Sequence, residues 1–288
     1  MRYQLALATR LGDRPSNQDR CAALERDGAV LLVLADGMGG HARGELAAQT
    51  LVDSLRDSFN AANLPVNAPR AFLRQALERA HVAVVENGHA QHPPVQPRTT
   101  AVACLVQGDR AHWAHVGDSR LYLVRAGTVG FRTQDHTYVQ ELQRHGMLST
   151  EQLRRHPLRN YVTRCIGGGL EAPVITEGPE TVLEPADVVL LCSDGLWSAV
   201  PESDLRAVGE AESLETTLDA LAEAAQKATY PQSDNISVVA LRWHDARPTA
   251  ASETESRPAS AASPGDSLTC AIAEIRQALR EYGGEMGD

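Results

Sequence analysis

LLVLADG at residues 31–37 and VVLLCSDG at residues 188–195 share one design, an apolar run that ends abruptly in Asp-Gly. Short runs rich in Val and Leu predict buried strands. An ionised and unpaired carboxylate directly after such a strand would lie beside the apolar core at a large cost in free energy. Asp36 and Asp194 therefore call for a compensating positive group, although one Asp-Gly by itself more often marks only a turn.

Three further aspartates lie beside predicted strands, and they are Asp19, Asp118 and Asp234. Because strand ends can meet at one rim of a sheet or sandwich, several of these carboxylates can converge, where they would repel one another without cations. Oxygen ligands without paired His or Cys favour Mg²⁺ or Mn²⁺ over zinc. Gly37 lets the main chain approach closely, and its carbonyl is a further candidate ligand.

The remaining pattern predicts the fold class. Apolar runs predict strands at residues 29–35, 100–106, 111–116, 120–124, 188–192 and 236–243. Helical spacing of apolar residues predicts helices at 44–59, 70–87 and 214–229. Two long helices after the first strand, followed by a β-meander, do not alternate as βαβ units. The chain is therefore predicted to be α+β, with sheets covered by helices.

Two of the predicted strands, residues 111–116 and 120–124, flank Gly117-Asp118-Ser119. Two β-rich runs separated by so short a polar turn predict a hairpin. Asp118 would then lie at the tip of that hairpin.

Composition restricts the classes of partner and compartment. A formal net charge of -10 argues against a broad basic surface for nucleic acid. The five cysteines form no C-x-x-C pair, which fits reduced thiols in a cytoplasmic protein better than a zinc or disulfide framework. The first ten residues are too polar for a signal peptide. The longest apolar run, residues 29–35, is far shorter than the roughly 20 residues that cross a bilayer. We expect a cytoplasmic protein without a membrane anchor.

Eight short motifs follow one another along roughly residues 1–243. They are RPSNQD (14–19), ADGMGGH (35–41), TTAV (99–102), VGDSRLY (116–122), DHT (135–137), VTRCIG (162–167), CSDGLW (192–197) and SDNIS (233–237). Each motif alone is weak, but the ordered set is specific. It resembles the metal-dependent protein phosphatase family of the 2C type, and its bacterial members in particular.

That resemblance implies a fold and an activity. The fold would be a sandwich of two antiparallel β-sheets flanked by helices, which agrees with the α+β prediction. The activity would be hydrolysis of phosphoserine and phosphothreonine in proteins by a metal-activated water, opposing a bacterial Ser/Thr kinase. The cofactors would be two Mn²⁺ or Mg²⁺ ions, with a weaker third site. No covalent phospho-enzyme is needed, so the cysteines need no catalytic role.

The resemblance also implies a role for each site residue. Asp36 would bridge two metals, with the Gly37 carbonyl on one of them, and Asp194 and Asp234 would hold the other. Asp118 with Asp194 would form the third site, and Asp19 would act in the outer shell. Arg14 would clamp the substrate phosphate. A planar guanidinium suits that last role because it can bind two oxygens at once.

The chain departs from the family pattern at two places beside these residues. Gln18 stands where many relatives carry Glu; it can orient a water but adds no negative charge. Met38 stands where members from higher organisms often carry a histidine, a candidate general acid, and nearby His41 has no assigned role. His136 is interpreted as fixing a loop. His112 and His115 fall on opposite faces of a strand and make poor joint ligands.

Residues 138–160, here called the basic segment, stand out in an acidic chain because they carry four arginines and two histidines. By position they resemble the variable flap beside the family's site. The segment either helps to receive phosphorylated substrates or is a simple solvated helix pair, and both interpretations stay open.

The chain is predicted to divide into three parts. Residues 1–245 would form the phosphatase catalytic domain, and residues 246–266, rich in Ala, Ser and Pro, a disordered linker. Residues 267–288 would contain a short amphipathic helix that ends at Gly283-Gly284. This helix either docks on its own domain or binds a partner.

Two rival functions remain. One is a catalytically silent module that keeps the fold and captures phosphoproteins, although silent relatives usually lose metal aspartates and all five are present here. The other is a phosphatase for a phosphorylated anti-sigma-type antagonist, which normally joins a sensor domain.

Overall fold

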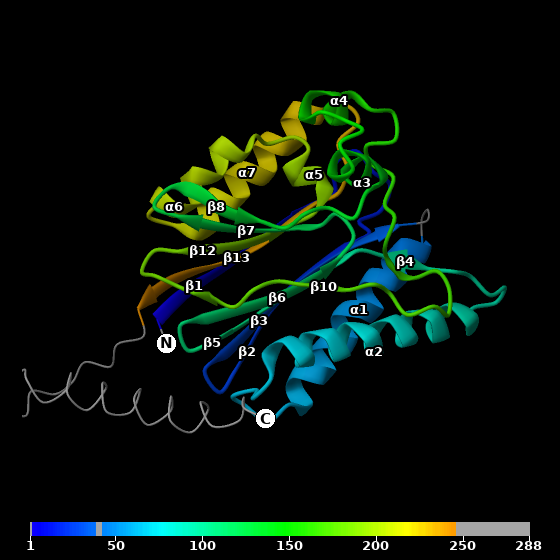
Figure 1. Ribbon diagram of the computed structural model, residues 1–288, viewed down its shortest axis with the longest axis horizontal. Helices are drawn as coiled ribbons and strands as arrows, with labels where there is room; N and C mark the ends of the chain where they lie inside the picture. The colour runs from blue at the N-terminus through cyan, green and yellow to red at the C-terminus, as the bar shows by residue number, and fades with distance from the viewer. Residues whose placement is uncertain (1, 39–41, 246–288) are drawn as a thin grey trace, which may run out of the picture. The chain divides into compact units, whose positions relative to one another are not determined.

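The computed structural model describes residues 2–38 and 42–245. Two β-sheets face each other, and helices cover the outer face of each (Figure 1). Every strand pair among the described residues is antiparallel. The predicted α+β sandwich is confirmed. The predicted linker and C-terminal helix lie outside the described residues, so the division of the chain into parts stays a prediction.

The first sheet runs in the order β1 (Arg2–Arg10), β13 (Ile236–Asp245), β12 (Val188–Cys192), β7 (Arg120–Arg125) and β8 (Thr128–Arg132). Its outer face is covered by α5 (Asp194–Trp197), the short 3-10 helix η1 (Glu202–Leu205), α6 (Arg206–Glu210) and α7 (Leu214–Thr229).

The second sheet runs in the order β10 (Thr176–Glu177), β6 (Arg110–Val116), β5 (Ala101–Gln107), β3 (Ala29–Met38), β4 (Arg98–Thr99) and β9 (Ile166–Gly167), with β2 (Asp19–Arg26) paired to β3 and β11 (Thr181–Val182) to β6. Helices α1 (Ala42–Ala61) and α2 (Pro69–His89) cover its outer face. Between β8 and β9 the chain forms α3 (Tyr138–Arg144) and α4 (Thr150–Arg155).

Burial on both faces explains why the sequences of β3 and β12 are continuous apolar runs. Along β3, Leu31 and Val33 pack toward α1 and α2, whereas Leu32 and Leu34 pack between the two sheets. A strand with helices on one face and a second sheet on the other has no solvent face to mark with polar residues. The three predicted helices and six predicted strands are all present. The more polar strands β1 and β2 were not predicted, because their apolar positions are sparse.

The predicted hairpin is wrong. Strand β6 pairs with β5, whereas β7 pairs with β12 and β8, so Gly117-Asp118-Ser119 carries the chain from one sheet to the other. A tight turn between two apolar runs has the same sequence pattern whether the two strands pair with each other or enter different sheets. Here both strands are buried on both faces and find their partners elsewhere in the chain.

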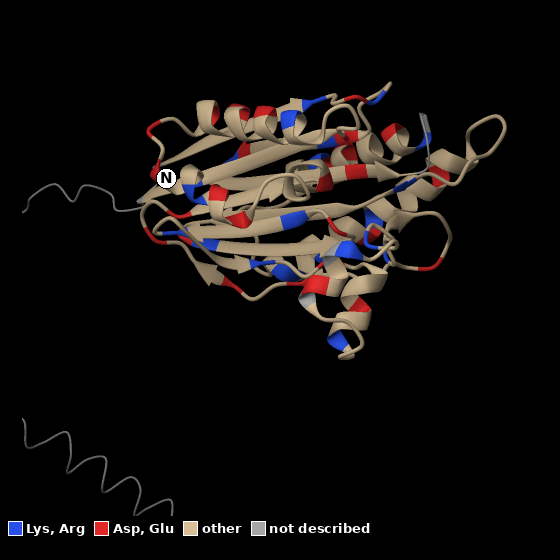
Figure 2. Cartoon of the chain, turned by 90° about the horizontal axis from the view of Figure 1, so that it is seen from above, with Lys and Arg blue, Asp and Glu red and all other residues tan. Residues whose placement is uncertain are grey.

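Charged residues of both signs are interspersed over the described elements (Figure 2). No helix in residues 2–38 and 42–245 has both the length and the apolar character needed to cross a membrane.

Candidate metal centre

Strand pairing brings the predicted site aspartates to one end of the sandwich. The β2–β3 register places Asp19 directly opposite Asp36. In the other sheet the end of β12 pairs with the start of β13, so that Asp194 and Asp234 lie at the same end of neighbouring strands. Asp118 joins them because its turn crosses between the sheets.

These residues line a cavity of about 420 Å³ that we call the carboxylate cavity. Its walls include the predicted site residues Arg14, Asp36, Gly37, Asp118, Asp194 and Asp234. Asp19 is buried and does not line the cavity, and its carboxylate accepts a hydrogen bond from the Ser193 hydroxyl at 2.7 Å. A larger hollow of about 710 Å³ between α1 and α2 contains only two of the chain's acidic residues, Asp53 and Asp57. We place the site where the carboxylates meet.

The TTAV motif holds the main chain of Asp36. The Asp36 amide donates to the Thr100 hydroxyl at 3.0 Å, and the Thr100 amide donates back to the Asp36 carbonyl at 2.8 Å. The Thr99 hydroxyl donates to the same carbonyl at 2.9 Å. Both threonines are fully buried. Their part in the site was missed from sequence, although the motif itself was visible.

Gly37 is required by the close approach of neighbouring main chain. A Cβ at this position would stand 2.2 Å from the Gly44 carbonyl oxygen and 2.8 Å from that of Gln18. The Gly37 amide donates to the Gln18 carbonyl at 3.2 Å. Any side chain here would force the backbone beside Asp36 to move.

Asn235, which sequence reasoning did not single out, ties together the loops that carry Arg14 and Asp234. Its side-chain amide donates to the carbonyls of Leu11 at 2.8 Å and Ser16 at 3.0 Å, and its side-chain oxygen accepts from the Gln18 amide at 2.9 Å. Arg14 in turn pairs with the Asp234 carboxylate at 2.7 Å. The SDNIS motif could have pointed to this residue.

His136 fixes the turn that carries Asp118, as predicted. The Gly117 amide donates to His136 Nδ1 at 3.0 Å, and the His136 amide donates to the Gly117 carbonyl at 2.9 Å. Because Nδ1 accepts, the ring proton is on Nε2, which donates to the Thr176 hydroxyl at 2.8 Å. Burial, and next the stacked His115, lower the pKa of His136 to about 3, so the ring is neutral.

Burial and mutual repulsion raise the pKa values of the carboxyl groups. Burial, followed by the charges of Asp19 and Asp194, raises the pKa of Asp36 well above its usual range. Burial raises the pKa of Asp194 to about 6 and that of Asp19 to about 7, with charge repulsion adding in each case. Burial, and then Asp194, also raise the pKa of Asp118. The ionised form of these carboxyl groups therefore needs compensating positive charge.

The donors fit hard divalent cations. Asp36, Gly37, Asp118, Asp194 and Asp234 line one cavity, and Arg14 is the one basic residue among the described residues of its lining. No three His, Cys, Asp or Glu side chains in the described ranges are already gathered tightly enough to hold one ion as they stand. Carboxylate and carbonyl oxygens are nevertheless the ligands that Mg²⁺ and Mn²⁺ prefer, and within residues 2–38 and 42–245 neither His nor Cys lines the cavity.

Some of the other residues named from the sequence line the carboxylate cavity, and others do not. Met38 lines the carboxylate cavity, as do Asn160, at the end of the basic segment, and Val162, which forms an isolated bridge with Thr137. Asn160 carried no signal in the sequence. His41 lies outside the described residues. Cys192 is a fully buried strand residue whose thiol pKa is raised by burial, which fits a structural role.

The comparisons with known proteins agree with this geometry. Residues 9–237, well over half of the chain, match the model of the family described as protein phosphatase 2C. The serine/threonine phosphatase stp of Listeria welshimeri is 31% identical over 230 residues, which cover 78% of this chain and 90% of that protein.

Two solved structures share the fold. The serine/threonine phosphatase of S. agalactiae superposes with a TM-score of 0.77 at 30% identity, over 83% of this chain and 99% of that one. The catalytic domain of the phosphatase PstP, solved in complex with two manganese ions, does so with a TM-score of 0.71 at 30% identity, over 84% of this chain and 99% of that one. The chain belongs to the protein phosphatase 2C family. The predicted enzyme class, a protein-serine/threonine phosphatase, is confirmed.

Proposed function

We propose that this chain hydrolyses phosphoserine and phosphothreonine in proteins at the carboxylate cavity. The observation that carries the proposal is the convergence of Asp36, Asp118, Asp194 and Asp234 around a cavity that also contains Arg14. Such a site can hold cations that attract a phosphate, beside a guanidinium that binds its oxygens.

The ligand roles proposed here are those that the family resemblance implies, and the positions of the residues are compatible with them. Asp36 lies opposite Asp19, and the charges of four other carboxylates act on it. We propose that two ions would share its carboxylate and that the Gly37 carbonyl would be a further ligand to one of them. Asp194 and Asp234, on neighbouring strands, would complete the second ion's set. Asp118 with Asp194 would hold a third, and the buried Asp19 would act through water. Mn²⁺ or Mg²⁺ suits this donor set.

When bound, the ions would supply Lewis-acid charge for the phosphoryl oxygens and a more acidic water. The chain's own residues then orient the substrate. Arg14, whose side chain is 55% exposed, can reach both the Asp234 carboxylate and a phosphate in the cavity. In this arrangement both ring nitrogens of His136 are engaged, one with Gly117 and the other with Thr176, so we do not assign this histidine the role of general acid.

The test is phosphate release from a phosphothreonine peptide by the purified full chain, measured in Mn²⁺, in Mg²⁺ and in chelator. Release with metal and none with chelator is expected. A folded protein that releases no phosphate with either metal would overturn the proposal in favour of the silent phosphoprotein-binding module. The presence of all five aspartates at one end of the sandwich favours the active enzyme.

We also propose that the chain acts in the cytoplasm against a cognate Ser/Thr kinase. Measuring phosphate release from an intact phosphorylated Ser/Thr kinase under the same conditions tests whether the chain acts against such a kinase. Whether a partner binds residues 267–288 stays a prediction, because these residues lie outside the described ranges.

The basic segment is expected to contribute to substrate binding. Arg155 and Arg159 are exposed, and Asn160 lines the carboxylate cavity directly after them. Reversing both charges (Arg155→Glu with Arg159→Glu) should lower kcat/KM for a phosphopeptide with acidic flanks roughly tenfold at low salt, since exposed charges act through a field that salt screens. Hydrolysis of a small aryl phosphate should change less than about twofold.

The matched control reverses two exposed charges on other helices, Arg79→Glu with Lys227→Glu. It should leave both substrates unaffected. Equal losses on the peptide and the aryl phosphate, or a loss in the control pair as well, would show that the basic segment is only a solvated helix pair.

A further inference from the structure

Helix α5 connects two carboxylates of the cavity through its two ends. It begins at Asp194 and ends at Trp197. The indole N–H of Trp197 donates to the main-chain carbonyl of Asp118 at 3.0 Å. One short helix thus carries a site carboxylate at its first residue and, at its last, a hydrogen bond to the residue that bears another.

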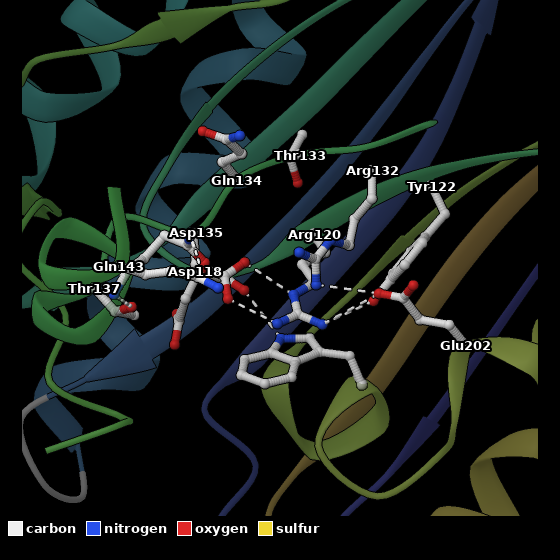
Figure 3. A network of polar contacts seen from close by, with 12 residues as sticks. Asp118, Arg120, Tyr122, Arg132, Thr133, Gln134, Asp135, Thr137, Gln143 and Glu202 are labelled. Carbon is white, nitrogen blue, oxygen red and sulfur yellow. Dashed lines mark hydrogen bonds and ion pairs between the residues drawn. The ribbon is translucent and has the colours of Figure 1, made fainter. Parts of the chain in front are cut away.

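The indole is itself held in place. The guanidinium carbon of Arg120 lies 3.6 Å from the centroid of the Trp197 ring. Arg120 makes two hydrogen bonds to the Asp135 carboxylate, at 2.8 and 2.7 Å, and a third to the Tyr122 hydroxyl at 3.0 Å (Figure 3). A buried guanidinium fixed in this way restricts the plane of the ring that stacks on it.

The contact acts directly on Asp118, whereas other contacts in the turn act on its neighbours. His136 holds Gly117, and the Ser119 hydroxyl lies 2.6 Å from that of Thr100. Trp197 takes the carbonyl of Asp118 itself. The main-chain position of Asp118 relative to α5 therefore depends on the indole.

We propose that Trp197 is a positioning residue that holds Asp118 at a set separation from Asp194, and thereby sets the affinity of the divalent ion that these two carboxylates share. The inference rests on the proposed function, in which that pair forms the weakest metal site. Two buried like charges separate when a constraint on one is lost, because repulsion drives them apart. An ion that needs both would then bind less tightly, whereas ions held by Asp36, Gly37 and Asp234 would not be affected.

The experiment compares Mn²⁺ binding by the full chain and by Trp197→Phe, using the electron paramagnetic resonance signal of free Mn²⁺ during titration. Phe keeps a ring under Arg120 but has no N–H. Loss of one hydrogen bond should weaken the weakest class of site about fivefold and leave the tighter classes unchanged. Asp118→Asn should remove the weakest class, and adding Trp197→Phe to it should have no further effect.

Trp243→Phe is the control for loss of an indole. Trp243 is 1% exposed in the core between the sheets, near the end of β13 that is farther from the site. It should lower the thermal midpoint more than Trp197→Phe does and leave all Mn²⁺ affinities unchanged. Equal Mn²⁺ binding by wild type and Trp197→Phe, or a loss shared by all sites, would overturn the inference alone. A wild-type chain that binds no Mn²⁺ would overturn the proposed function and the inference together.

Discussion

Asp36→Asn is expected to lower kcat/KM for a phosphothreonine peptide in Mn²⁺ by about 1000-fold or more. Asp36 lines the carboxylate cavity, and the charges of Asp19, Asp118, Asp194 and Asp234 all act on it. An amide has the shape of the carboxylate but no charge, so the variant keeps the cavity and loses the ligand that two ions would share. Phosphate release under saturating peptide and Mn²⁺ gives the measurement.

The same variant should be more stable than wild type when metal is absent. The folded state raises the pKa of Asp36, so the stability that its protonated form contributes is present below its usual pKa and lost as the pH rises through the raised value. Asn cannot ionise and avoids that loss. In chelator at pH 7.5 its thermal midpoint should exceed that of wild type by several degrees, and the gap should close toward pH 4.

Mn²⁺ should reverse the order of stability, since wild type gains more from an ion that binds only the folded state. Asp57→Asn, which changes an exposed aspartate on α1, is the matched control and should alter neither activity nor stability. Near-wild-type hydrolysis by Asp36→Asn, or lower stability in chelator at pH 7.5, would contradict the central place given to this residue.

Arg120→Met should destabilise the protein by about 3–5 kcal/mol, because it leaves the Asp135 carboxylate buried without its partner. The two side chains are 10% and 8% exposed and lie 2.7 Å apart. A loss of that size corresponds to a fall of roughly 10 °C in the thermal midpoint of a domain this large. Thermal unfolding followed by circular dichroism measures it.

Two further variants distinguish the effect of breaking the buried Arg120–Asp135 pair from the effect of removing any charged side chain. Lys227→Met breaks an exposed pair with Glu223 on α7 and should cost far less stability than Arg120→Met does, because solvent screens exposed charges. Asp135→Leu added to Arg120→Met should recover much of the lost stability, because no buried charge then remains. A loss in Arg120→Met below about 1 kcal/mol would mean that solvent reaches Asp135 and that the Arg120–Asp135 pair does not stiffen the guanidinium that stacks on Trp197.

Several parts of the site could be predicted because one residue type in one setting carries the signal. Asp36 and Asp194 follow continuous apolar runs, and such runs indicate strands buried on both faces. Gly37 was expected to allow close approach of the main chain, and a Cβ there would stand only 2.2 Å from the Gly44 carbonyl oxygen. Thr100, Asn235 and Trp197 were not predicted as supporting residues, because their partners are distant in sequence and nothing local identifies a hydrogen bond to a particular carbonyl.

The turn at Asp118 shows the same limit. Local sequence indicated two strands and a tight turn, both of which are present, but pairing is decided by which strands offer complementary apolar faces across the whole chain. Only the tertiary structure could show that β6 and β7 separate into different sheets.

The sequence by itself determined the class of fold and the family, and it indicated the candidate site residues, because strand burial, helical periodicity and ordered motifs are local properties. The tertiary structure decided how these residues meet. It placed Asp19 opposite Asp36, sent the Asp118 turn from one sheet to the other, and set Trp197 beneath Arg120 with its N–H on Asp118. Those relations join segments many residues apart, and they arise only when both sheets pack together and bury their shared faces.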